Sequence, residues 1–107
     1  MPPASLRVII TASAEADLFA IERYWHGQGE PWRGDKYFAD LTDFAESELC
    51  DAARASRGRR FKSRRHANAH EMLAFGVYRV IYKIDLKASR VRVLRFWHSH
   101  RDAPPLD

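Results

Sequence analysis

The spacing of apolar residues changes once along the chain, and this change constrains the fold more than any other feature. Between residues 14 and 49 apolar side chains recur every three or four positions, as Leu18, Ile21 and Trp25 do, which is typical of amphipathic helices. Between residues 71 and 97 apolar and polar side chains alternate, which is typical of strands. The sequence therefore predicts an α+β fold in which helices precede most of a sheet.

The predicted order is an N-terminal strand, a helical hairpin and a three-stranded antiparallel meander. Thr11 or Ser13 can cap the first helix, and the Gly- and Pro-containing residues 27–31 stop it. Because amphipathic helices must bury their apolar stripes, we expect both to pack on one face of the sheet and to leave the other partly open. The predicted ranges are strand 6–10, second helix 32–53, and strands 71–75, 77–84 and 90–97.

Length and cysteine content exclude several classes of protein. The 107 residues fit one domain, and we expect residues 1–107 to form it. The single cysteine, Cys50, cannot form an internal disulfide, and we expect it to be buried on the second helix. No apolar run approaches the roughly 20 residues of a membrane span. The N-terminus lacks the pattern of a signal peptide, so we expect a cytoplasmic location.

Charge is distributed unevenly between the two halves of the chain. Residues 1–50 carry four basic and nine acidic side chains, whereas residues 51–107 carry fourteen and five. The densest stretch, Arg54–Arg65, holds seven basic residues and no acid, and we call it the basic segment. This asymmetry indicates an anionic partner for the second half. Charge alone does not choose among a nucleic acid, a membrane surface and an acidic protein.

Alternation along the predicted strands places particular side chains on the face away from the helices. Arg79 and Lys83 share one face of their strand, so they would lie in the middle of a concave sheet if that face is open. Phe96 and Trp97 are adjacent, so one of them must face away from the helices. An exposed aromatic there would suit docking of a protein partner. Trp25 lies on the helical stripe and is expected in the core.

Three passages of the sequence resemble the ParE/RelE superfamily of type II toxins. The opening strand is followed by a helix that begins TASAEADL, and residues 76–83 read GVYRVIYK, similar to the family's G-x-Y-R core strand. Residues 91–102 read VRVLRFWHSHRD, similar to the closing V-x-V-L-R pattern that ends in H-x-x-R-D. Each motif is short and tolerant, but their order and spacing over residues 6–102 are specific in combination.

The resemblance implies a bacterial toxin that a co-encoded antitoxin holds inactive. The closing H-x-x-R-D is more similar to ParE, whose members act on DNA gyrase, block replication and are not known as nucleases. RelE-type members cut messenger RNA in the ribosome with basic residues on the sheet and a Tyr or His near the C-terminus. This chain departs from both patterns, because residues 54–68 are unusually basic and because Trp97, His98 and His100 stand where RelE carries its C-terminal aromatic.

An RNA-cleaving interpretation requires groups that hold a phosphate and move protons. Arginines suit the phosphate and histidines suit acid–base work near neutral pH. The alternative is that the arginines bind acidic groups of the antitoxin or brace the tail. His98 and His100 could also share a metal ion on a strand, but only Asp102 offers a third ligand, and no metal is expected. The candidate nuclease residues are Arg79, Lys83, Arg95, His98 and His100.

The leading hypothesis is a ParE-like toxin that binds its target rather than an enzyme, with no cofactor and no membrane. Its partner would be an antitoxin with an acidic, amphipathic segment that folds on binding, giving a hetero-oligomer. A RelE-like ribosome-dependent endoribonuclease and a non-toxic nucleic-acid-binding module are the alternatives. The residues expected to bind the target or the antitoxin are Arg59, Arg60, Arg64, Arg65, Arg79, Arg95, Trp97 and Arg101.

Overall fold

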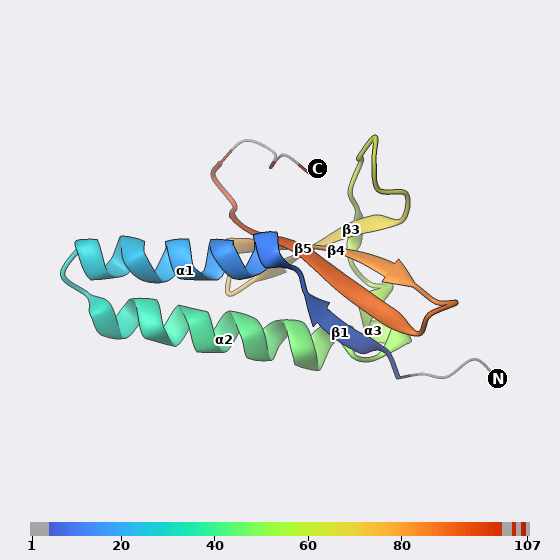
Figure 1. Cartoon of the computed structure of the whole chain (residues 1–107), viewed down its shortest axis with the longest axis horizontal. Coiled ribbons are helices and arrows are strands. Elements are labelled where there is room, and N and C mark those ends of the chain that lie inside the picture. The colour runs from blue at the N-terminus through green and yellow to red at the C-terminus, as the bar shows by residue number, and fades with distance from the viewer. Residues whose placement is uncertain (1–4, 102–103, 105, 107) are drawn as a thin grey trace.

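A helical hairpin extends from one side of a five-stranded sheet in the computed structural model, which describes residues 5–101, 104 and 106 (Figure 1). The two long helices lie antiparallel, and no helix in the described chain is long and apolar enough to cross a membrane. In chain order the elements are β1 (Arg7–Ile10), α1 (Ala12–Gly27), α2 (Pro31–Leu49), α3 (Ala52–Ala55), β2 (Arg59–Arg60), β3 (Ala69–Ala74), β4 (Tyr78–Asp85) and β5 (Arg90–His98).

The sheet has the strand order β1-β5-β4-β3-β2. Strands β3, β4 and β5 pair antiparallel, which confirms the predicted meander. Strand β1 pairs parallel to β5, so the sheet as a whole is mixed. The helical hairpin provides the long crossover that a parallel pair requires. Strand β2, which was not predicted, pairs its two residues with β3 and ties the basic segment to the sheet.

The helices begin and end where local chemistry satisfies their free backbone groups. Thr11 caps α1 by accepting the N–H of Ala14 at 3.3 Å, and its hydroxyl donates to the Val93 carbonyl at 2.7 Å. Helix α2 ends at Leu49, short of the predicted residue 53, and Asp51 caps the separate helix α3. Cys50 therefore lies at the exposed end of α2, and its predicted burial was wrong.

The main core lies between the helical hairpin and one face of the sheet, as predicted. Leu18 and Leu41 from the helices are fully buried against Val80, Tyr82 and Phe96 from the strands. Trp25 lies at the margin of this core and is only partly buried. Its ring stacks on that of Tyr37, with the centroids 6.0 Å apart. Gly34 allows the helices to approach closely, because an added Cβ would lie 2.7 Å from the Glu22 carbonyl.

A second, smaller core covers part of the opposite face of the sheet. Ile81, Leu94 and Trp97 are buried there, and Phe61 from the basic segment and Leu106 from the C-terminal tail pack against them. An irregularity in the β4–β5 ladder leaves Leu94 without a partner strand residue, because Ile81 pairs with Arg95 and the next residue pairs with Val93. The face expected to be partly open is therefore covered over these residues.

Tyr82 fixes the point at which the basic segment leaves the helices. Its ring is fully buried, and its hydroxyl donates to the Ala55 carbonyl at the end of α3. Burial raises the pKa of Tyr82 to about 12. Gly58 makes this approach possible, since a Cβ at that position would lie 1.9 Å from the Tyr82 hydroxyl oxygen. The start of the basic segment is thus locked to the main core.

Candidate functional site

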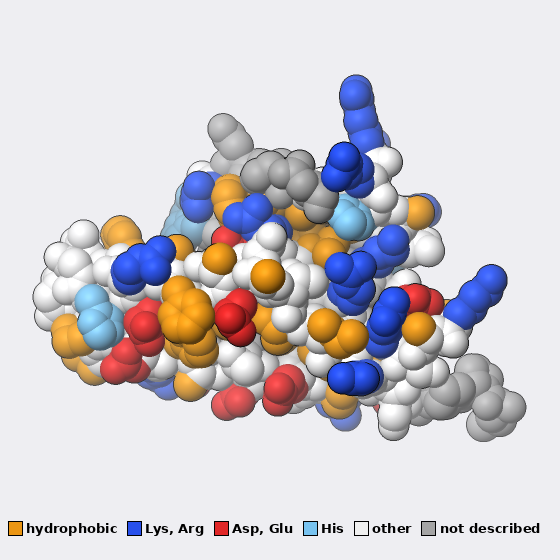
Figure 2. Space-filling model, viewed as in Figure 1, with side chains coloured by type: hydrophobic (Ala, Val, Ile, Leu, Met, Phe, Trp, Pro, Cys, Tyr) orange, Lys and Arg blue, Asp and Glu red, His pale blue; other side chains and the backbone are white. Residues whose placement is uncertain are grey.

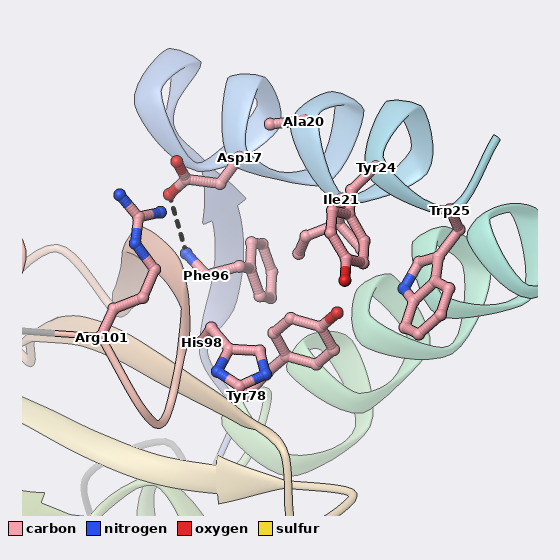
Figure 3. Close-up of a pocket in the computed structure, with 9 residues that line it drawn as sticks. All are labelled: Asp17, Ala20, Ile21, Tyr24, Trp25, Tyr78, Phe96, His98 and Arg101. Carbon is pink, nitrogen blue, oxygen red and sulfur yellow. Dashed lines mark hydrogen bonds between the residues drawn. The ribbon is translucent and has the colours of Figure 1, made fainter. Parts of the chain in front are cut away.

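An apolar pocket of about 380 Å³ opens between α1 and the adjoining ends of β4 and β5. Side chains from α1 face Tyr78, Phe96 and His98 across it (Figure 3). The helical stripe of period 3.6 supplies one wall and the alternation of the strands supplies the other. The pocket is lined by Asp17, Ala20, Ile21, Tyr24, Trp25, Tyr78, Phe96, His98 and Arg101.

Aromatic rings shape this pocket and carry few polar atoms into it. Tyr78 meets the His98 ring edge to face, with the centroids 5.6 Å apart, and burial raises the pKa of Tyr78. Tyr24 is 57% exposed at the rim. The indole N–H of Trp25 is buried and makes no hydrogen bond of good geometry within the described chain, although it lies near enough to the Tyr78 hydroxyl to oppose the rise in the Tyr78 pKa. The arrangement suits an apolar side chain together with one hydrogen-bond acceptor.

Asp17 closes one end of the pocket and joins α1 to β5. Its carboxylate accepts the backbone N–H of Phe96 at 3.0 Å. It also accepts both forks of the Arg95 guanidinium, at 2.7 and 2.8 Å. Both side chains are largely buried, so the bidentate pair fixes their geometry. Arg95, expected to bind a partner or a phosphate, has its guanidinium committed to this ion pair.

On the opposite face of the sheet the carboxylate of Glu71 likewise binds arginine side chains. One carboxylate oxygen accepts from Arg59 and the other from Arg79, whose Nε and Nη2 lie at 2.9 and 2.7 Å. Burial acts to raise the pKa of Glu71, but the hydrogen bonds and charges of the two arginines outweigh it, and the pKa is lowered. Arg79 also lies over the Phe61 ring, 5.7 Å from its centroid.

Neither Asp17 nor Glu71 was predicted from the sequence to bind the arginines of the site. The register places Glu71 beside Leu73 and Arg79 on one face, so strand alternation could have identified it once the pairing was known. Asp17 pairs across 78 residues, for which the sequence carries no local signal.

The structure does not bring the candidate nuclease residues together. Tyr78 and His98 are partners in the register and face the helices, whereas Arg79 and its partner Trp97 face the other way. His98 is therefore separated from Arg79 and Lys83 by the sheet itself. His100 follows the end of β5, is exposed, and donates its backbone N–H to His98 Nδ1 at 3.2 Å.

Trp97 faces away from the helices, as one residue of the Phe96–Trp97 pair must, but it is buried rather than exposed. The guanidinium of Arg95 lies 4.6 Å from its ring centroid and that of Arg101 lies 3.8 Å away. Arg101 is exposed and also lines the apolar pocket. Asp102, the last residue of the closing motif, lies outside the described residues.

The remaining predicted binding residues lie in the basic segment and are exposed. Arg60, Arg64 and Arg65 point to solvent, and the side chain of Arg59 is 83% exposed although it pairs with Glu71. Figure 2 shows Lys and Arg side chains gathered over the sheet end of the molecule, while acidic side chains lie over the helical hairpin. The two ends of the molecule thus differ in charge.

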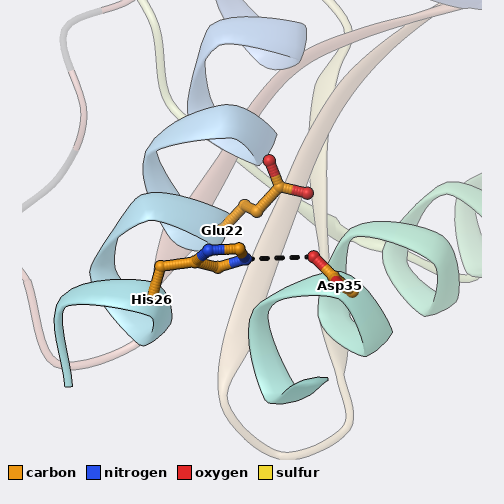
Figure 4. A group of neighbouring side chains, drawn as sticks. All are labelled: Glu22, His26 and Asp35. Carbon is orange, nitrogen blue, oxygen red and sulfur yellow. Dashed lines mark hydrogen bonds and ion pairs between the residues drawn. The ribbon is translucent and has the colours of Figure 1, made fainter. Parts of the chain in front are cut away.

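A separate cluster near the tip of the hairpin contains groups that can ligate metals. Ligand atoms of Glu22, His26 and Asp35 lie within 4.8 Å of one another (Figure 4). His26 Nε2 and Asp35 Oδ1 are 3.1 Å apart and both side chains are exposed. The hydrogen bond joins the last turn of α1 to the start of α2, so we assign the cluster a bracing role. His98 and His100 belong to no such cluster within the described residues.

Comparison with known proteins identifies relatives of this geometry. A sequence family described as the ParE toxin of type II toxin–antitoxin systems, parDE, matches residues 8–103. A structure of the chromosomal ParDE toxin–antitoxin system from P. aeruginosa superposes with a TM-score of 0.73 at 18% identity, covering 90% of this chain and 98% of that one. The toxin–antitoxin complex RelBE2 from Mycobacterium tuberculosis gives 0.66 at 23%, covering 88% and 98%. No curated protein matches the sequence.

Proposed function

Because this chain belongs to the ParE toxin family of type II toxin–antitoxin systems, we propose that it stops bacterial growth by binding DNA gyrase in the cytoplasm. The observation that carries the proposal is the family match over residues 8–103, which covers the helical hairpin and every strand of the sheet except the first residue of β1. Residues 1–107 would act as one toxin domain. The resemblance of the closing H-x-x-R-D motif to ParE favours gyrase over the ribosome as the target.

Binding rather than catalysis is the activity that the geometry favours. Arg79 and Arg95 each have a carboxylate bound to their guanidinium, so a phosphate would have to compete with Glu71 and Asp17. His98 lies on the other face of the sheet from Arg79. General acid–base catalysis requires such groups within hydrogen-bond reach of one substrate. We therefore propose that the toxin blocks its target by occupying it.

We further propose that a co-encoded antitoxin neutralises the toxin by docking in the apolar pocket. An amphipathic segment would insert an apolar side chain between Ile21 and Phe96, and a carbonyl or carboxylate would accept the Trp25 N–H. Tyr24 at the rim offers the kind of exposed aromatic that dominates binding energy. The cation of Arg101 at the same pocket favours an acidic segment.

Purified gyrase provides the direct test of the target. We expect the chain to inhibit supercoiling of relaxed plasmid DNA, and an equimolar amount of the antitoxin encoded beside it to restore the activity. A ribosome programmed with messenger RNA serves as the parallel assay, and we expect its message to remain intact. Full supercoiling together with cleaved messenger RNA would overturn the gyrase proposal in favour of a ribosome-dependent nuclease.

A further inference from the structure

After β2 the basic segment continues into the loop between β2 and β3, which projects beyond the sheet (Figure 1). Exposure alternates along it: Arg60, Lys62 and Arg64 are exposed, whereas Phe61 and Ser63 are partly buried. Alternation of this kind places consecutive cations on one side of an extended chain. The segment therefore presents a row of three cations to solvent.

The inward side chains hold the row in place. Phe61 packs on the second core, and its backbone N–H donates to the Ala69 carbonyl at 2.8 Å. The Ser63 hydroxyl accepts the backbone N–H groups of Arg65 and His66 at 3.3 and 3.1 Å, which turns the chain back toward β3. The cations thus stand on a loop that is anchored at its base and at its turn.

Nothing within the described chain neutralises these cations. Arg59 pairs with Glu71, but no ion pair with a described acid involves the other exposed cations of the segment. Like charges held together in one loop repel one another, and an anionic partner removes that repulsion. The cations without an ion pair in the described residues are Arg54, Arg57, Arg60, Lys62, Arg64 and Arg65.

The chemistry of the segment distinguishes between two kinds of anionic partner. The core of a protein interface requires apolar or aromatic anchors in addition to charge. The basic segment offers none, because Ala55 is fully buried, Phe61 packs inward and its other residues are basic, Ser or Gly. A phosphodiester backbone requires only cations and hydrogen-bond donors, and arginine binds it bidentately. The absence of apolar anchors favours a nucleic acid.

We propose that the basic segment is a binding site for the phosphodiester backbone of a nucleic acid, with Arg60, Lys62 and Arg64 as its central contacts. The site lies apart from the apolar pocket and shares no residue with it. A toxin with antitoxin in that pocket would therefore keep the site. The proposal does not depend on gyrase being the target, since it concerns the free chain and a bare nucleic acid.

Fluorescence anisotropy with a short labelled duplex DNA of arbitrary sequence tests the proposal, and a labelled single-stranded RNA is the second arm. The full chain is compared with a triple variant, Arg60→Gln, Lys62→Gln and Arg64→Gln, over a series of NaCl concentrations. The control variant, Arg23→Gln, Lys36→Gln and Lys87→Gln, removes the same net charge elsewhere from exposed positions. Thermal unfolding shows that each variant is folded.

We expect the wild type to bind with an affinity that falls steeply with salt. In the triple variant affinity should fall more than about tenfold, and the slope of log affinity against log salt should decrease by about 2 to 3, since each phosphate contact contributes about 0.9. The control should lose less than about one unit of slope. Tighter binding of duplex DNA or of RNA identifies which nucleic acid the backbone site prefers.

Three results would overturn the proposal. The first is no binding of either nucleic acid by the wild type at low salt. The second is an equal loss in the triple variant and the control, because net charge rather than the segment would then explain binding. The third is preferential binding of poly-glutamate that the triple variant loses, which would make the segment a site for an acidic protein.

Discussion

The helical hairpin and the sheet end of the molecule offer opposite kinds of surface. Residues 12–49 carry three basic and nine acidic side chains, and exposed aromatics such as Tyr24 and Trp32 lie among them. The basic segment carries seven basic side chains and no acid, and its one aromatic packs inward. This difference supports the two proposals of a protein partner at the apolar pocket and a polyanion at the basic segment.

Polar side chains that interact within the fold differ in burial between the hairpin tip and the sheet. Near the hairpin tip the hydrogen bond between His26 and Asp35 joins two exposed side chains. At the sheet the carboxylates of Asp17, which comes from α1, and of Glu71, which comes from β3, are largely buried, and each binds arginine through two nitrogens. Exposed pairs contribute little to stability, whereas breaking a buried one leaves an uncompensated charge. Four variants probe the difference between the two ends, and their expected effects decrease from Gly58→Ala to Asp35→Asn.

The largest effect is expected where the basic segment joins the main core. Gly58→Ala places a Cβ 1.9 Å from the Tyr82 hydroxyl oxygen and 3.0 Å from the Glu71 carbonyl, so the fully buried Tyr82 ring or the chain around residue 58 must shift. We expect the free energy of unfolding in urea to fall by about 3 kcal/mol. Gly27→Ala is the matched control, because its Cβ would meet no atom within 4 Å. Equal free energies of unfolding for the two variants would contradict the close packing of Gly58 against Tyr82.

Glu71→Gln tests the buried carboxylate that balances Arg59 and Arg79. We expect a loss of about 2 kcal/mol near pH 7, less than for a fully buried pair because Arg59 is exposed. The pKa of Glu71 is lowered in the folded state, so its contribution is present above its ordinary value of 4.5 and disappears as pH falls below that value. The difference between wild type and variant in urea should therefore shrink in acid. A difference independent of pH would contradict this account.

Tyr24→Ala tests whether the antitoxin binds at the apolar pocket. The side chain is 57% exposed, so stability should change little, whereas antitoxin affinity should fall about 30-fold if Tyr24 is a binding hot spot. Leu86→Ala is the control, because this exposed side chain lies in the turn between β4 and β5. Isothermal titration calorimetry measures both affinities. Equal antitoxin affinities of the two variants would show that the antitoxin does not bind at the apolar pocket.

The smallest effect is expected for the exposed pair at the hairpin. Asp35→Asn removes the partner of His26, and the unfolding free energy should fall by less than about 0.5 kcal/mol, since both side chains are solvated. Measured beside Glu71→Gln under the same conditions, it separates exposed from buried charge directly. A loss of unfolding free energy as large as that of Glu71→Gln would contradict the expected difference between exposed and buried charged groups.

Much of the fold followed from local patterns in the sequence. The helical stripe through Leu18 and Ile21 and the alternation in β4 identified the hairpin, the meander and the face on which they pack. The end of α2 was missed because Asp51 caps a new short helix, a choice that periodicity does not encode. The parallel pairing of β1 with β5 was not predicted, because it depends on a contact across the whole chain.

The candidate site could be predicted only in part. The exposed arginines of the basic segment follow from its composition, since it holds seven basic residues, no acid, and only Ala55 and Phe61 as apolar residues. The commitment of Arg79 to Glu71 and of Arg95 to Asp17 depends on register and on a helix–sheet contact, which a single sequence does not reveal. Trp97 was placed on the correct face, but its burial under the C-terminal tail and Phe61 depends on tertiary packing.

Pulse labelling of DNA and protein synthesis after induction of this chain in a bacterial host tests whether the chain is a gyrase-directed toxin. We expect DNA synthesis to stop first and cells to filament, and co-expression of the antitoxin to prevent both. An early stop of protein synthesis would contradict this expectation and return Arg79, Arg95 and His98 to consideration as catalytic groups. Unchanged synthesis of both polymers would contradict the toxic function itself.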